Sequence, residues 1–124
     1  MSVLLSLKDG FFQSVQTAET VGTISGSAGF TQYLDFDTGN VFSHAYSANV
    51  TYAFSNPPVS GISFGFTLKI TPSATATVAW PSSVDWGDGT APTAPASGAT
   101  NVYSFYTVDG GTTYYGFLAG AAMA

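Results

Sequence analysis

The fold class of this chain is decided by the stretch Gly61-Ile-Ser-Phe-Gly-Phe-Thr-Leu-Lys-Ile-Thr71. Large apolar side chains stand at every second position from Ile62 to Ile70, and serine, glycine, threonine and lysine stand between them. An unbroken period of two is the pattern of a β-strand with one face in a core and the other facing outward. We therefore predict a strand over residues 61–71 that crosses the core.

The segments on both sides of this stretch repeat the pattern, separated by Gly, Pro and Asn clusters every 8 to 12 residues or so, which is typical of an all-β chain. The further strands that we predict span residues 33–37, 41–46, 49–54, 75–80, 84–86, 101–108 and 113–119. Residues 37–40 form a turn after which residues 41–46 return, and residues 109–112 form a hairpin turn. This predicts an all-β fold: a single-domain antiparallel β-sandwich or jelly roll over residues 31–124, with residues 1–30 as a short N-terminal arm or edge segment.

Charge is scarce in this sequence. Of its 124 residues 7% are charged, against about 25% in a typical soluble domain. Two lysines, Lys8 and Lys69, no arginine and seven acidic residues give a net charge of −5. This composition excludes nucleic-acid binding, which needs clustered basic residues, and argues against binding to an anionic membrane. We interpret the weakly charged surface as one that meets other protein over much of its area.

Few residues could support catalysis or bind a metal. There is no cysteine, and the one histidine, His44, lies in an alternating strand without an accompanying Ser–Asp pattern, so we interpret it as a core or interface residue. Asp85 and Asp88 could approach each other as in a calcium loop, but the turn-forming role of Asp and Gly is favoured. We predict a non-enzymatic protein with no cofactor and no metal site.

Export and membrane-spanning segments are not predicted either. The apolar run near the N-terminus, from Val3 to Leu7, is shorter than a signal peptide requires and no positive charge precedes it. No apolar stretch approaches the roughly 20 residues that span a bilayer. We therefore expect synthesis in a cytoplasm, with no membrane partner.

Aromatic residues gather on both faces of the predicted C-terminal hairpin. A monomeric sandwich needs rings on one face only, so the others could stack on sugar rings or pack against a neighbouring subunit. We favour subunit packing, because the low charge independently points to an interface. The predicted oligomer-interface residues are Trp86, Tyr103, Phe105, Tyr106, Tyr114, Tyr115 and Phe117.

A series of short motifs over residues 31–118 carries a family resemblance. The motifs are Tyr33-Leu-Asp-Phe36, Asn49-Val-Thr-Tyr-Ala-Phe-Ser-Asn-Pro-Pro58, Ala79-Trp-Pro-Ser-Ser-Val-Asp-Trp-Gly-Asp-Gly-Thr-Ala-Pro-Thr93, Val102-Tyr-Ser-Phe-Tyr-Thr-Val-Asp-Gly-Gly111 and Thr113-Tyr-Tyr-Gly-Phe117. Together they resemble a small β-domain of tailed-bacteriophage virion structural proteins, of the tail-fibre and capsid-decoration type. The resemblance implies a homotrimer on the exterior of the phage particle and transfers no catalytic residue.

The sequence departs from the usual setting of this domain, because the domain fills nearly the whole chain and no heptad run or repeat supplies a fibre shaft. We therefore expect a capsid decoration (cement) protein whose partner is the major capsid protein or another virion protein. The residues expected to dock on the capsid are Leu4, Leu5, Leu7, Phe11 and Phe12. The alternative is a receptor- or carbohydrate-binding tip of a tail or capsid fibre, with Trp86, Tyr103 and Tyr115 exposed towards a host-surface glycan.

Overall fold

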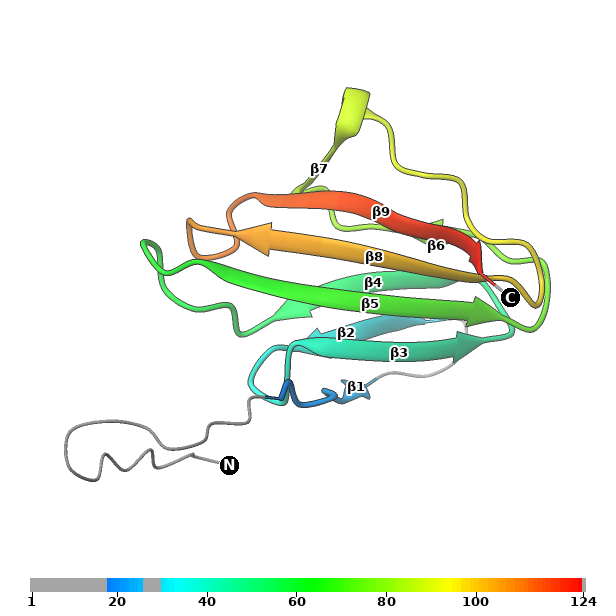
Figure 1. The fold of residues 1–124 in the computed structure, drawn as a ribbon, viewed down its shortest axis with the longest axis horizontal. Helices are drawn as coiled ribbons and strands as arrows, with labels where there is room; N and C mark the ends of the chain where they lie inside the picture. Colours follow the sequence, from blue (N-terminus) through cyan, green and yellow to red (C-terminus); the bar gives the residue numbers. More distant parts are fainter. Residues whose placement is uncertain (1–17, 26–29, 124) are drawn as a thin grey trace.

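The computed structural model describes residues 18–25 and 30–123. They form two β-sheets packed against each other, which confirms the predicted all-β sandwich (Figure 1). The strands in chain order are β1 (Ile24–Ser25), β2 (Thr31–Asp35), β3 (Val41–Tyr46), β4 (Val50–Ser55), β5 (Phe64–Pro72), β6 (Val78–Ala79), β7 (Val84–Trp86), β8 (Thr100–Thr107) and β9 (Tyr114–Met123). Within these ranges the one helical element is a short 3-10 turn, η1 (Gly87–Gly89), and no helix is long and apolar enough to cross a membrane.

Both sheets are mixed, which corrects the expectation of an antiparallel sandwich. The four-stranded sheet has the order β1-β2-β4-β6, and the five-stranded sheet has the order β3-β5-β8-β9-β7. The pairs β2/β4, β4/β6, β3/β5 and β7/β9 are parallel, whereas β1/β2, β5/β8 and β8/β9 are antiparallel. From β2 to β6 the chain alternates between the sheets, so consecutive strands face each other across the core instead of pairing.

The turn predicted at residues 37–40 is present, but it carries the chain from one sheet to the other. The N–H of Thr38 donates to the carbonyl of Asp35 (3.0 Å), and the N–H of Asp37 donates to the Asp35 carboxylate (3.0 Å). This short-range bonding reverses the chain without placing β3 beside β2. Leu34 of β2 and Phe42 of β3 are both fully buried, one on each sheet.

The strand predicted over residues 61–71 begins only at Phe64, although its inward residues Phe66, Leu68 and Ile70 are buried as expected. Gly61 has a φ of 92°, which favours glycine, and its N–H donates to the carbonyl of Val108 (3.0 Å). The chain therefore turns here, and the side chain of Ile62 is exposed instead of lying in the core. The strand predicted over 75–80 is likewise reduced to the two residues of β6.

Aromatic rings dominate the space between the sheets. The rings of Phe66 and Phe105 stack at 4.7 Å, and Phe36 lies 4.5 Å from Phe66. At the other end of the core, the ring of Trp80 stacks on Tyr52 at 5.3 Å. Fully burying a large apolar side chain contributes about 1.5–3 kcal/mol, so this aromatic layer is a main source of stability.

The hairpin β8–β9 matches its prediction closely. Gly110 and Gly111 have φ values of 70° and 84°, and the Asp109 carboxylate accepts hydrogen bonds from the Thr113 N–H (3.0 Å) and the Thr107 hydroxyl (3.0 Å). The bond from the Thr113 backbone is the main reason that the pKa of Asp109 lies below its usual value. In Figure 1 this turn and the loop before β5 lie side by side at one end of the sandwich.

Candidate interaction site

The aromatic residues predicted to form an oligomer interface divide into two groups. Tyr103, Phe105 and Tyr114 are 0%, 1% and 3% exposed and pack inside their own sandwich. Their side chains have no surface left for a neighbouring subunit, so the interface prediction is wrong for these three. Burial raises the pKa of Tyr103, and raises that of Tyr114 to about 12 with a contribution from the nearby Asp109 charge. Both hydroxyls therefore stay protonated near neutral pH.

Trp86 is partly buried and also belongs mainly to the core. Its ring lies 5.3 Å from Trp80 and 5.5 Å from Phe105. It covers Gly116 of β9, where an added Cβ would lie 2.8 Å from the Trp86 ring. A glycine at this position is what allows the indole to pack flat on the sheet.

The remaining three residues form what we call the aromatic strip: Tyr106, Tyr115 and Phe117, which are 41%, 39% and 53% exposed. They lie on the outer face of the five-stranded sheet, and Tyr106 is directly opposite Tyr115 in the β8–β9 register. The rings of Tyr106 and Tyr115 lie 5.2 Å apart, and those of Tyr106 and Phe117 are parallel within 6° at 6.3 Å. The strip is therefore a continuous apolar surface.

The β9 edge next to the strip is incompletely paired. β7 pairs only with Tyr114 to Gly116, and within the described ranges no strand pairs with that side of β9 from Phe117 to Met123. An apolar groove of about 390 Å³ separates this part of β9 from the loop at residues 92–96. Leu118 and Met123 add exposed apolar surface here, and such an open edge favours association with another chain.

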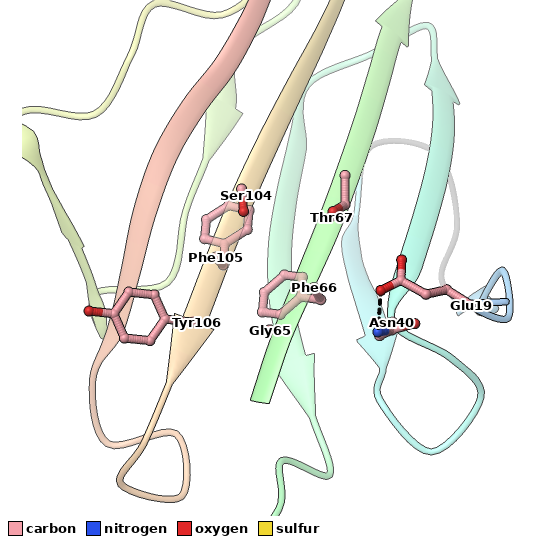
Figure 2. A pocket seen from close by; sticks show the side chains of 8 residues that line it. All are labelled: Glu19, Asn40, Gly65, Phe66, Thr67, Ser104, Phe105 and Tyr106. Carbon is pink, nitrogen blue, oxygen red and sulfur yellow. Dashed lines mark hydrogen bonds between the residues drawn. The ribbon is translucent and has the colours of Figure 1, made fainter. Parts of the chain in front are cut away.

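On the opposite side of Tyr106 a second groove runs over β5 and β8 (Figure 2). We call it the glycine groove; its volume is about 430 Å³. Its floor is the backbone around Gly65, which has no side chain to cover the sheet. Five side chains on the outer surface line the groove: Glu19, Asn40, Thr67, Ser104 and Tyr106. Phe66 and Phe105 line it with their backbone, because their side chains point into the core.

Glu19 and Asn40 form the wall of this groove opposite Tyr106. The Asn40 side-chain amide donates to a Glu19 carboxylate oxygen (3.2 Å), as the dashed line in Figure 2 shows. The backbone holds them in place, since the Thr67 N–H donates to the Asn40 carbonyl (2.9 Å) and the Asn40 N–H donates to the Thr20 carbonyl (3.3 Å). Gly39 is required beside this wall, because an added Cβ would collide with the Thr20 carbonyl oxygen.

His44 has a structural environment. Its Nδ1 is 2.7 Å from the Tyr52 hydroxyl, and its ring stacks near Tyr46 at 5.7 Å. Burial lowers its pKa below 6.5. The Tyr46 hydroxyl beside it is buried and has no hydrogen-bond partner, and burial raises the pKa of Tyr46 to about 12.

The aspartates weighed as a calcium loop lie around η1. Asp85 and Asp88 are both exposed, and Asp88 has a φ of 56°, the left-handed conformation that Asp tolerates in turns. In the part of the chain that the structure describes, no three His, Asp or Glu side chains gather as a metal site would require.

The predicted capsid-docking residues Leu4, Leu5, Leu7, Phe11 and Phe12 lie outside the described residues. Sequence reasoning overlooked Glu19, Asn40 and Gly65. A signal for Gly65 was present, because a glycine on the outward side of a strongly alternating strand often marks a close approach by a ligand or another chain. Comparison with known protein families, curated proteins and solved structures finds no match to this chain.

Proposed function

We propose that this chain is a non-enzymatic structural protein of a tailed-phage virion: a capsid decoration protein that associates as a homotrimer and docks on the capsid shell. The observation that carries the proposal is the aromatic strip beside an open sheet edge, in a chain with 7% charged residues. Aromatic residues are enriched and charged residues depleted at the centre of protein interfaces. The motifs that resemble phage virion domains supply the biological setting.

The strip alone is too small for a stable interface. An aromatic side chain buries about 150–250 Å² in full, and these three are roughly half exposed, so they offer about 300 Å² together. One partner in a standard interface contributes about 800 Å². The β9 edge from Phe117 to Met123 and the apolar groove beside it are the adjoining surface that would supply the remainder.

The first experiment is light scattering on the full chain near neutral pH. We expect a trimer, and we expect the double variant Tyr115→Ser/Phe117→Ser to be monomeric with an unchanged circular dichroism spectrum. The matched control is Tyr33→Ser, which removes a similarly exposed ring from the four-stranded sheet and should leave the trimer intact. A monomeric parent chain, or a double variant that still forms the trimer, contradicts the proposal.

The alternative function is a receptor- or carbohydrate-binding tip of a tail or capsid fibre. The ring platform first expected for it does not form, because Tyr103 is buried and Trp86 is mainly a core residue. Deleting residues 1–15 distinguishes the two functions. A decoration protein should lose binding to capsids and keep its trimer, whereas a receptor-binding tip should keep its binding to sugar or cells.

A further inference from the structure

We propose that the glycine groove is a binding site for a neutral oligosaccharide, with one pyranose ring lying on the sheet between Tyr106 and Glu19. This goes beyond the capsid role and does not depend on it. The groove lies over β5 and β8, whereas Tyr115, Phe117 and the open edge lie on β9. An interface over β9 therefore meets the groove only at Tyr106.

The hydrogen bonds that the groove can offer come mainly from side chains. β5 pairs with β8 over Phe64–Ile70 but with β3 only from Thr67 onward, so among the described strands the stretch of β5 that lacks a second neighbour is Phe64–Phe66. An extended peptide that added as a further strand would find only this short stretch free, less than the roughly 5–6 residues of a typical strand. The ligand has to bond with side chains instead, and those present are hydroxyls, an amide and a carboxylate.

These side chains fit the hydroxyl groups of a sugar. The Glu19 carboxylate can accept from neighbouring hydroxyls, and hydrogen bonds to a charged acceptor are about twice as strong as neutral ones. Thr67 and Ser104 can each donate or accept across the floor. The hydrogen bond from Asn40 holds the Glu19 carboxylate in position before any ligand arrives. Figure 2 shows Glu19 and Tyr106 on opposite sides of β5.

Tyr106 forms the apolar border of the groove on the β8 side. This residue is 41% exposed, and in Figure 2 its ring points from β8 away from β5; on that side it packs beside Tyr115 and Phe117 of β9. A site that combines an apolar border with a few placed polar groups suits a ligand that is apolar on one face and polar at its edge, as a pyranose is. Gly65 lets such a flat ring reach the sheet, since any larger side chain there would stand in its place.

Charge selects a neutral sugar over an acidic one. Glu19 lines the groove, and Lys69, the one lysine among the described residues, stands on the same face of β5 but is not part of the lining. The net charge of −5 adds a general repulsion of anions. A ligand that bears carboxylates or phosphates would therefore meet a repulsive carboxylate, and no cation among the described lining residues offsets it.

The test is to titrate the isotope-labelled full chain with oligosaccharides and to monitor binding through the NMR signals of the Gly65 backbone amide and the Asn40 side-chain amide. The neutral probes are the tetrasaccharides cellotetraose, maltotetraose, mannotetraose, galactotetraose and N-acetylchitotetraose, and the acidic probe is tetragalacturonate. We expect at least one neutral probe to shift both signals with a dissociation constant of about 0.1–1 mM, as suits an open groove with a few polar side chains. We expect no shift with tetragalacturonate.

Three variants sharpen the result. Gly65→Val fills the floor of the groove and should weaken sugar binding by about tenfold or more. The variant should fold, because a Cβ at position 65 would be 3.4 Å from the nearest atom, the Phe105 carbonyl oxygen. Ala45→Val makes a comparable change on the outer face of β3, away from the groove, and should bind normally. Glu19→Gln keeps the shape, and should weaken neutral binding and reduce the discrimination against tetragalacturonate.

The proposal is overturned if none of the five neutral probes shifts the Gly65 amide, or if Gly65→Val binds as the parent chain does. It is also overturned if Gly65→Val changes the mass measured by light scattering while no sugar binds, because the groove would then be covered by a second copy. Light scattering on the same samples keeps the two proposals separate. A trimer that binds no sugar refutes only the groove, and a monomer that binds sugar refutes only the capsid role.

Discussion

The two faces of the β8–β9 hairpin carry the same kinds of side chain and have different roles. On the inner face Tyr103, Phe105 and Tyr114 are buried among the rings of the opposite sheet, whereas one residue further along, Tyr106 and Tyr115 are open to solvent. The chemistry of the residues does not explain this difference, because tyrosine occurs on both faces. It follows from the position of the second sheet, which covers one face only. A residue type therefore identifies a core or an interface only after the covered face is known.

Removing one ring from each face should give the largest contrast. Phe105→Ala should lower the free energy of unfolding by about 3–5 kcal/mol, because the cavity left in a packed core is only partly refilled. Phe117→Ala should change it by less than about 0.5 kcal/mol, because half of that side chain is already exposed. Denaturation in urea, at protein concentrations low enough to suppress association, measures both. Equal losses would show that the outer face is as tightly packed as the core.

The glycines of the two faces offer a second contrast. Gly116→Val should destabilise the protein by about 1–3 kcal/mol, because its Cβ would lie 2.8 Å from the Trp86 ring and 2.9 Å from a methyl carbon of Val84. Gly65→Val meets only van der Waals contacts on the outer side, the nearest with the Phe105 carbonyl oxygen at 3.4 Å, and should leave stability unchanged or slightly raise it, since valine favours strands. Thermal unfolding of the two variants is the measurement. A large loss for Gly65→Val would mean that the glycine groove is not open.

Removing either of two tyrosine hydroxyls that point into the core, those of Tyr103 on β8 and Tyr46 on β3, should change the free energy of unfolding by different amounts. Tyr103→Phe should cost about 1–2 kcal/mol, because the Asn101 amide that donates to this hydroxyl (3.1 Å) would be left buried without that acceptor. Tyr46→Phe should be neutral or stabilising, because it removes a buried hydroxyl that has no partner. Urea denaturation compares the two variants directly. If Tyr46→Phe proved the more destabilising, its hydroxyl would need a partner such as a buried water molecule.

A smaller effect is expected from pH. Burial holds the folded-state pKa of His44 below 6.5, so as the pH falls through about 6.5 the unfolded chain takes up a proton before the folded protein does. The free energy of unfolding should therefore decrease as the pH falls through this range, until the folded-state pKa is reached. Denaturation at about pH 7.5 and about pH 5 measures this loss. His44→Asn should reduce the pH dependence, and an unchanged dependence would assign it to other groups.

Much of the fold could be predicted from local patterns, because strand alternation and turn chemistry involve residues close together in the chain. The alternation over residues 61–71 located β5 and its buried residues Phe66, Leu68 and Ile70. Asp109 and the two glycines after it indicated the hairpin turn and thus the antiparallel pairing of β8 with β9. Errors arose where a distant contact ended a local pattern, as at Gly61, whose N–H bonds to the carbonyl of Val108.

The candidate site was less accessible to sequence reasoning. Glu19, Asn40, Gly65 and Tyr106 come from four separate parts of the chain, and only the sheet order β3-β5-β8-β9 brings them together. Gly39 allows residues near Thr20 to approach the turn before β3, which places Glu19 beside Asn40. A sequence pattern with a period of two contains no information about such approaches.

From the amino-acid sequence alone it follows that this chain is all-β, that both faces of its C-terminal hairpin carry aromatic rings, and that charged residues are few, because these properties are local or compositional. Which sheet each strand joins and which face of the hairpin is buried depend on contacts between distant segments, and became known from the three-dimensional structure. Burial of apolar surface is non-directional, and the parallel pairing of β3 with β5 joins segments separated by the whole of β4. The packing of one sheet on the other therefore separated Phe105 in the core from Tyr106 on the surface.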